Sequence, residues 1–573
     1  MKKTCTWVGI VSSALVLSAC GSSNSDSNTS PLSSIGISHA LLISIDGLHQ
    51  QDVANCISSN TCPNIASLAN TGVTYTGANT PGLSDSVPGL AALVTGGSPK
   101  TTGLFYDDIY DRTLYSGVDL NCTGTQGVEV FLQEQVGIDG YNGGALAHLD
   151  GGGDFNPQQI PRRKNASGAC LPVYPHEFTQ TNTIFEVVRQ NIPGAFTAWA
   201  DKHAWGTDWV NGPSGTGVND FARTEINSDY NTARGQTTPA GYDFTNSPTQ
   251  TKVFDHYHTQ IVINQIDGLD STGVVSAAMG GALQSNKIPV PTLFGTNYQT
   301  LSVSQKALNV NGGGYTDANF TPNTLTADAI KFLDGEIGAI KTELANKNLL
   351  SSTVIIITAK HGQTPADRSK LRKIGDTIAS TLTAANLGAN SVIGSGADAV
   401  TGNALGTGQF TEDDVGFIWL NSQSDAARAS AVAALKANIG CPAVDPNTKI
   451  IVAGQVNPGI CAGVDAGSAV IDLKADGRFG DPTLGRTPDI MVQPNFGVIY
   501  SKSGKKDAEH GGAASTDTGV GLIVSNPALA KQTVATQVLT TQVAPTIIQA
   551  LKLDPNLLNS VKSEGTAVLP NLF

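Results

Sequence analysis

The sequence has little charge and no excess of positive charge. Charged residues make up 14% of its 573 residues, and 34 Lys and Arg are set against 47 Asp and Glu, for a net charge of −13. General nucleic-acid binding requires a basic face, so this balance argues against nucleic acid as a partner. A small basic pocket for a phosphate group is still compatible with it. The low charge and the 63 glycines are typical of a loop-rich protein outside the cytoplasm.

Long hydrophobic runs are also missing after the N-terminus, so no later segment is expected to span a membrane. The N-terminus has a basic start at Lys2 and Lys3 and an apolar run over residues 7–19, the length of a signal-peptide core. This run ends in Leu-Ser-Ala-Cys-Gly, which resembles the lipobox of bacterial lipoproteins. We therefore expect residues 1–19 to be a signal peptide and Cys20 to be the lipidated first residue. An ordinary signal peptide with a chance cysteine is the alternative.

Residues 20–37 are rich in Ser, Asn and Gly, and a flexible tether is the structure that this composition favours. The protein is thus expected to be exported and held on a bacterial membrane by lipid alone, on the periplasmic or cell-surface side. The choice between inner and outer membrane stays open, as does the oligomeric state.

The sequence contains no CxxC pair, which disfavours a cysteine-based zinc site. Cys5 leaves with the signal peptide, so six cysteines remain after Cys20. An even number in an oxidising compartment indicates disulfides. Proximity in the sequence favours the pairs Cys56–Cys62, Cys122–Cys170 and Cys441–Cys461, although other pairings are open.

Short apolar runs alternate with amphipathic ones in the mature chain. This alternation predicts an α/β sandwich around a mainly parallel sheet, in one domain over residues 38–573. Stretches at about 105–180 and 205–250 lack periodicity, and we interpret them as insertions around the site. Strands are expected at 39–46, 353–358 and 519–525, and helices at 64–70, 88–94, 322–347 and 536–552.

Four short motifs carry candidate chemistry. Asp46 ends the first strand, Ser86 precedes a helix that has Pro88 in its first turn, and His361 and His510 each stand before a glycine. Asp and His side chains are common zinc ligands. A hydroxyl at a helix N-terminus lies where backbone N–H groups favour a bound phosphate. Each motif alone is also typical of a turn or a helix start.

The order and spacing of these motifs are more specific, and from about residue 38 to 550 they resemble the type I phosphodiesterase/nucleotide pyrophosphatase branch of the alkaline phosphatase superfamily. The resemblance implies an alkaline-phosphatase-like three-layer sandwich and hydrolysis of phosphate mono- or diesters of small molecules. It further implies a phosphorylated Ser86 as intermediate and one or two divalent metal ions, zinc above all. The implied metal ligands are Asp46, Ser86, His361 and His510.

Two parts of the family pattern are missing. Lys360 stands where the family has the aspartate before His-Gly, which replaces a carboxylate by an ammonium. The Asp-x-x-Gly-His element is also absent, and its expected strand at 292–299 carries the neutral residues Asn297 and Gln299 instead. We expect Lys360 to act in catalysis, and Lys360 and Asn297 to contact the substrate.

Three accounts of the metal site follow from these departures. One metal ion remains at Asp46, Ser86 and His361, with Lys360 supplying the charge of the other. Alternatively, a second site is completed by other residues, for which the candidates are Asp201, His203, His256 and His258. In the third account the chain is a degenerate member that binds ligands at the cell surface. A related hydrolase of phosphonates or sulfate esters is a further alternative, although Leu90 stands where sulfatases carry an arginine.

Overall fold

The computed structural model describes residues 32–132, 160–203, 208–223, 226, 244–245, 247–278, 282–387, 409–455, 458–463, 469–481, 483–501 and 504–573. The expected signal peptide, Cys20 and most of the tether lie outside these residues, as do large parts of the insertions expected at 105–180 and 205–250. Among the described residues, no helix combines the length and apolar character needed to cross a membrane.

An eight-stranded sheet forms the centre of the molecule, in the order β19-β2-β18-β11-β1-β10-β8-β9. Most neighbours run parallel, and the antiparallel strand β18 is inserted between β11 and β2. The predicted mainly parallel α/β fold is therefore confirmed. The strands are β1 (His39–Ile45), β2 (Gly72–Tyr75), β8 (Ala198–Asp201), β9 (Asp220–Arg223), β10 (Leu293–Tyr298), β11 (Thr353–Thr358), β18 (Ile523–Ser525) and β19 (Gln532–Val534).

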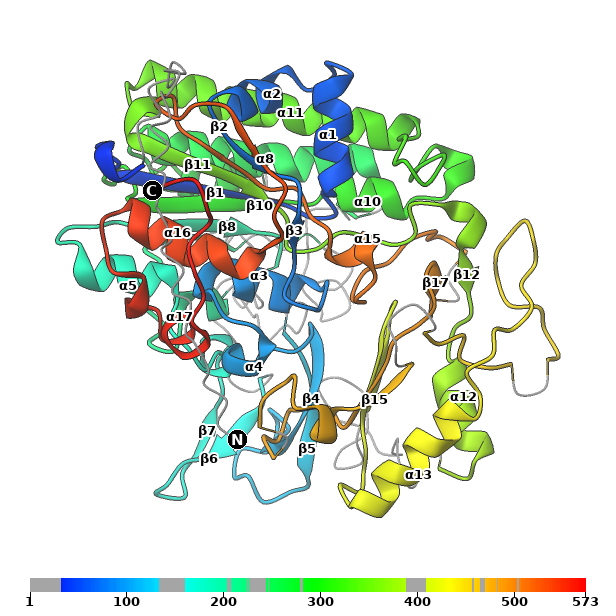
Figure 1. Ribbon diagram of the computed structural model, residues 1–573. Coiled ribbons are helices and arrows are strands. Elements are labelled where there is room, and N and C mark those ends of the chain that lie inside the picture. The colour runs from blue at the N-terminus through cyan, green and yellow to red at the C-terminus, as the bar shows by residue number, and fades with distance from the viewer. Residues whose placement is uncertain are drawn as a thin grey trace, which may run out of the picture.

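Helices cover both faces of this sheet, which makes the three layers visible in Figure 1. Because both faces are covered, the central strands are apolar throughout, and every residue of β10 and β11 is buried. On one face lie α1 (Gln50–Ser58), α2 (Pro63–Asn70), α8 (Pro248–Ile266), α10 (Thr300–Lys306) and α11 (Thr324–Asn346). On the other lie α3 (Ser86–Thr95), α5 (Ile184–Asn191) and α16 (Val543–Ala550).

Two expected elements are shorter than predicted. The helix expected at 536–552 begins only at α16, because Val538–Leu539 form a short strand, β20, that pairs in parallel with β3 (Ala78–Asn79). The strand expected at 519–525 is regular only over β18, from Ile523 onward. In both cases the local pattern is right about the element and wrong about where it begins, because pairing with a distant segment decides that point.

Two four-stranded sheets accompany the main one. The first, in the order β5-β4-β6-β7, is built from β4 (Asp108–Tyr115), β5 (Gln126–Phe131), β6 (Arg162–Lys164) and β7 (Cys170–Pro172). The second belongs to a lobe with its own apolar core, at the lower right of Figure 1. That lobe contains β13 (Gln409–Glu412), β14 (Gly416–Trp419), β15 (Val470–Asp472) and β16 (Ile490–Val492), with α12 (Thr377–Ala384) and α13 (Asp425–Lys436).

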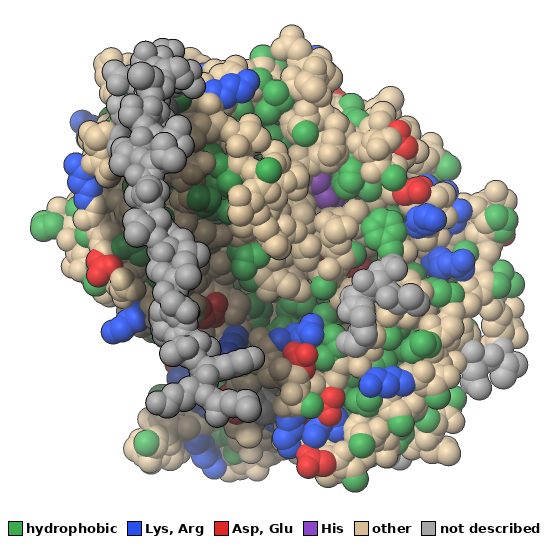
Figure 2. All heavy atoms as spheres, viewed as in Figure 1, with side chains coloured by type: hydrophobic (Ala, Val, Ile, Leu, Met, Phe, Trp, Pro, Cys, Tyr) green, Lys and Arg blue, Asp and Glu red, His purple; other side chains and the backbone are tan. Residues whose placement is uncertain are grey.

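All three disulfides favoured by sequence proximity are present. Cys56–Cys62 joins the end of α1 to the start of α2, Cys122–Cys170 lies in the β4–β7 region, and Cys441–Cys461 lies in the lobe. On the face shown in Figure 2, Lys and Arg side chains are scattered among acidic, polar and apolar ones, and they form no continuous basic surface there.

We expect Gly295→Ala to destabilise the central sheet. A Cβ atom at Gly295 would lie 2.1 Å from the carbonyl oxygen of Leu42 and 2.7 Å from the Trp199 ring. Overpacking of this kind costs about 1–3 kcal/mol, which urea unfolding would detect as a lower midpoint. Gly335→Ala is the control, because Gly335 is an exposed position of α11 with open space around it. Equal unfolding midpoints for the two variants would contradict the packing argument.

Candidate active site

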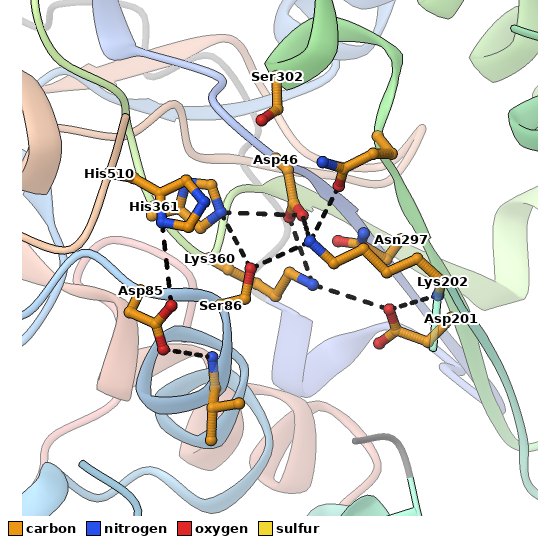
Figure 3. Close-up of polar contacts among 12 residues, drawn as sticks. Asp46, Asp85, Ser86, Asp201, Lys202, Asn297, Ser302, Lys360, His361 and His510 are labelled. Carbon is orange, nitrogen blue, oxygen red and sulfur yellow. Dashed lines mark hydrogen bonds and ion pairs between the residues drawn. The ribbon is translucent and has the colours of Figure 1, made fainter. Parts of the chain in front are cut away.

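The candidate site lies at the carboxyl ends of four adjacent parallel strands, β11, β1, β10 and β8. Asp46 follows β1, Lys202 follows β8, and Lys360 and His361 come just after β11. Asn297 is the next-to-last residue of β10. Parallel strands point their carboxyl ends to one edge, which is where ligands of such sheets bind. Side chains from segments far apart in the sequence therefore converge there (Figure 3).

Ser86 is the first residue of α3, and the Asp85 side chain caps this helix by accepting a hydrogen bond from the backbone N–H of Val87. The helix approaches the loop after β11 unusually closely. A Cβ atom at Gly89 would lie 2.1 Å from the carbonyl oxygen of Lys360, so only glycine fits at this contact. This approach brings the Ser86 hydroxyl, in a residue that is 2% exposed, to His361.

The Ser86 hydroxyl has two partners with different roles. Its Oγ lies 3.2 Å from His361 Nε2 and 3.2 Å from Lys202 Nζ. His361 Nδ1 lies 2.8 Å from the carbonyl oxygen of Gly362, so Nδ1 carries the ring proton and donates it. Burial lowers the pKa of His361 to about 3, which keeps the ring neutral. Nε2 is therefore an acceptor for the Ser86 hydroxyl, while Lys202 donates to the same oxygen.

Lys202 and Lys360 place two buried ammonium groups around the Asp46 carboxylate. Lys202 Nζ donates to Asp46 Oδ2 at 2.8 Å and to Gln299 Oε1 at 3.1 Å. Lys360 Nζ lies 3.4 Å from Asp46 Oδ1 and 3.7 Å from Asp201 Oδ1. Burial by itself would raise the pKa of Asp46, but the two lysines and His361 together lower it well below its usual range. Asp46 is thus the shared counter-ion of two cations.

The ion pair also keeps Lys202 charged. Burial lowers the pKa of a lysine, but the attraction of Asp46 outweighs this effect and the pKa of Lys202 is raised. Asp201, which also accepts hydrogen bonds from Trp199 Nε1 and from the backbone N–H of Lys202, adds a second negative charge near Lys360. The site therefore holds two fixed positive charges close to the Ser86 hydroxyl.

His510 packs against His361 and does not point at Asp46. The two imidazole rings are stacked with centroids 3.8 Å apart, and His510 Nδ1 lies 3.9 Å from Asp85 Oδ2 (Figure 3). Burial lowers the pKa of His510 well below its usual value, and the positive charges of nearby lysines act in the same direction. The structure thus brings together Asp46, Ser86, Asn297, Lys360 and His361 as expected, with His510 behind the His361 ring.

The comparisons with known proteins bear on this arrangement. A family model described as type I phosphodiesterase/nucleotide pyrophosphatase matches residues 40–517, which is most of the chain. The chain belongs to this family. Its members are hydrolases of phosphoesters, and so is this chain. No curated protein sequence matches significantly.

Solved structures that are similar to this chain share little sequence with it. The murine and human ectonucleotide pyrophosphatase/phosphodiesterase 5 are 13% and 12% identical, with a TM-score of 0.47 each. These alignments cover 90% of this chain and 96% or 95% of theirs. Wild-type alkaline phosphatase PafA is 12% identical over 90% of this chain and 96% of its own, with a TM-score of 0.52, and shows the alkaline-phosphatase-like fold.

Family members generally depend on divalent metal ions, but the described residues do not fit such ions well. Metal ligands are carboxylates, neutral imidazoles and thiolates, whereas an ammonium repels a cation. Lys202 Nζ contacts both Asp46 and Ser86. The ammonium therefore occupies the space that a metal ion bound to both of these side chains would need. Within the described ranges, no group of three His, Cys, Asp or Glu side chains is arranged to hold a metal.

The four candidates for a second metal site do not assemble into one. His256 lies on α8, is half exposed and pairs with Glu336 of α11. His258 is buried beneath β10, with Nδ1 3.0 Å from the carbonyl oxygen of Asn297. Asp201 pairs with Lys360 and accepts a hydrogen bond from the backbone N–H of Lys202. His203 is buried two residues further along the chain. Across the part of the chain that the structure describes, these side chains form no ligand group.

Lys202 is the site residue that we did not expect from the sequence. Its neighbours Asp201 and His203 are named from the sequence, but only as candidate ligands of a second metal ion. The available signal is the short apolar run Ala198–Ala200, which ends in charged residues just as the strand before Asp46 does. Gln299, which accepts a hydrogen bond from Lys202, belongs to the strand expected at 292–299.

We expect Asp46→Asn to destabilise the protein by about 3–5 kcal/mol, because two buried ammonium groups lose their shared counter-ion. Urea unfolding measures this loss. Combined with Lys202→Met, the same substitution should cost much less than the sum of the single effects. Asp328→Asn, at an exposed ion pair with Lys252, is the control and should change stability by less than about 1 kcal/mol. Additive effects of the two site substitutions would rule out the coupling.

Proposed function

We propose that this hydrolase cleaves phosphate mono- or diesters of small molecules through a phosphorylated Ser86. The observation that carries the proposal is the position of the Ser86 hydroxyl. It lies at the N-terminus of α3, between the lone pair of His361 Nε2 and the ammonium of Lys202. A hydroxyl flanked by a base and a cation is an activated nucleophile.

In the first step Ser86 Oγ attacks phosphorus and its proton moves to His361 Nε2. The bond between phosphorus and the leaving-group oxygen breaks, and this oxygen takes the electron pair and the proton that His361 had accepted, so His361 Nε2 is neutral again before the second step. Charge that develops on the other phosphoryl oxygens is stabilised by Lys202 and Lys360, at fixed positions in a water-poor site. The N–H groups at the start of α3 favour the same negative charge.

In the second step water releases the phosphoryl group. The water oxygen attacks phosphorus and gives one proton to His361 Nε2, and the bond between phosphorus and Ser86 Oγ breaks. Ser86 then recovers its proton from His361. His361 keeps one orientation throughout, because its Nδ1–H is held by the carbonyl oxygen of Gly362. The residues named here supply every proton transfer of the cycle.

We propose further that the enzyme is exported and held on the periplasmic or cell-surface side of a bacterial membrane through lipid on Cys20. The lipobox-like sequence before Cys20 supports this location, and so do three disulfides, since disulfides persist in oxidising compartments. A lipid anchor and a short tether would leave the site open to small phosphorylated molecules.

Ser86→Ala should lower kcat by about a thousand-fold or more, because the covalent step loses its nucleophile. Hydrolysis of bis-p-nitrophenyl phosphate and p-nitrophenyl phosphate measures the effect, with circular dichroism as the check on folding. Mass spectrometry of the acid-quenched wild-type enzyme should find phosphate on the peptide that contains Ser86.

Unchanged turnover in Ser86→Ala would refute the role of Ser86. A well-folded wild-type protein that binds these esters but hydrolyses neither them nor p-nitrophenyl sulfate would instead identify a binding protein.

Cys20→Ser should move the protein from the membrane fraction to the soluble fraction of cells that export it, because the acylated thioether cannot form. Immunoblotting of the two fractions measures the change, and a high-salt wash of wild-type membranes is the control for electrostatic attachment. Equal membrane association of both proteins would contradict the lipid anchor.

A further inference from the structure

We infer that Lys202 and Lys360 together replace the metal ions of this fold, so that the enzyme cleaves its ester without a divalent metal. The activity part of this inference rests on the proposed function. The binding part, namely that the wild-type site rejects zinc, can be tested by itself.

The first step of the argument is the position of Lys202. Its Nζ touches the carboxylate of Asp46 at 2.8 Å and the hydroxyl of Ser86 at 3.2 Å. A zinc ion joining the same two oxygens would sit about 2.0–2.2 Å from a carboxylate ligand, inside the volume that the ammonium fills. The ion and the ammonium therefore exclude each other by volume and by charge. Lys202 also performs the task of such an ion, since it places positive charge on the nucleophilic oxygen.

The second step is the position of Lys360 on the other side of Asp46. Lys360 takes the place of a carboxylate in the family pattern, so it removes a metal ligand and adds a positive charge. Its distances to Asp46 and Asp201, 3.4 and 3.7 Å, exceed the length of a strong N–H···O bond. The ammonium can therefore turn its hydrogens toward a bound phosphoryl oxygen at little cost.

The third step is the side-chain amide of Asn297, unpartnered within the described part of the chain, which indicates where a ligand binds beside the two lysines. Asn297 is fully buried, and neither polar atom of its side-chain amide has a hydrogen-bond partner among the described residues. Figure 3 shows this amide beside Lys202, within the group that surrounds Asp46. Buried amides are seldom left unsatisfied, so a polar ligand atom is expected there. A phosphoryl oxygen between Lys202, Lys360 and Asn297 would accept a hydrogen bond from Asn297 Nδ2 and so satisfy this donor.

The contrast with a metal site also appears in the neutral residues around the pair. Gln299 Oε1 accepts a hydrogen bond from Lys202 Nζ at 3.1 Å and so orients the ammonium. A metal site would need an anionic ligand at this position, whereas the Gln299 side chain is neutral. His361 Nε2 is turned to Ser86 Oγ at 3.2 Å and lies 3.8 Å from Asp46 Oδ2. The imidazole that would ligate a metal is thus engaged as the base for the serine.

The first experiment uses the full mature chain with its disulfides intact. After dialysis against EDTA and 1,10-phenanthroline, elemental analysis should find far less than one equivalent of metal, with the hydrolysis rate of bis-p-nitrophenyl phosphate unchanged. Added zinc should not raise this rate. Loss of hydrolysis on chelation, with recovery on adding zinc, would overturn the inference.

The second experiment tests the replacement directly. Lys202→Met should lower kcat/KM for the diester by about a thousand-fold, and zinc should not restore it, because the charge on Ser86 is lost. Lys373→Met is the matched control. Lys373 is equally buried and pairs with Asp507 at 2.9 Å, apart from the groups that contact Ser86, so its loss should leave kcat/KM unchanged. Equal effects of the two substitutions would overturn the role of Lys202.

The third experiment reads metal binding without activity. Titration calorimetry with zinc should show no stoichiometric binding to the wild type, whereas a variant carrying Lys202→Met and Lys360→Asp should bind it. The wild-type titration decides the inference even where the double variant does not fold, since stoichiometric zinc binding by the wild type would overturn it. A wild type that neither binds zinc nor hydrolyses any ester refutes the proposed function and still supports the exclusion of metal.

Discussion

The Asp46 carboxylate, fully buried and shared by two ammonium groups, is the interaction on which the site depends. Taking three charges out of water is expensive, and only close opposite charges offset that cost. Because Asp46 lies between Lys202 and Lys360, loss of Asp46 would leave two buried ammonium groups without their shared counter-ion. The same arrangement leaves both cations directed at the space beside Ser86. Structural stability and the capacity to hold an anion thus depend on the same three side chains.

The sheet supplies the precision that this arrangement needs. β11, β1, β10 and β8 are neighbours in parallel register, so residues that follow them arrive at one edge with little freedom. Residues separated by more than a hundred positions, such as Asp46 and Lys202, meet at hydrogen-bond distance because rigid strands carry them. The peripheral sheet and the lobe with its own core contribute none of these four strands.

The general fold and most of the site residues could be predicted from the sequence. Asp46, Ser86 and His361 each follow or begin a strongly patterned element, so local periodicity locates them at the carboxyl edge. Lys202 follows a strand of only four residues, whose place in the sheet is decided by pairing with β10. Such pairing is a property of the folded chain, and no local pattern reports it. For the same reason the sequence shows that Lys360 replaces an acidic ligand, but it does not show that Lys202 lies beside the same carboxylate.

The contact between Gly89 and the carbonyl oxygen of Lys360 limits how this site can evolve. Any side chain at position 89 would push the first turn of α3 away from the loop after β11, and would carry the Ser86 hydroxyl away from His361. Position 89 therefore has to remain glycine for as long as α3 and this loop keep their contact. A chain in which lysines took the place of metal ligands would have to keep the backbone at this junction in the same position. The side chains that carry the chemistry can therefore be exchanged, whereas the backbone that positions them cannot.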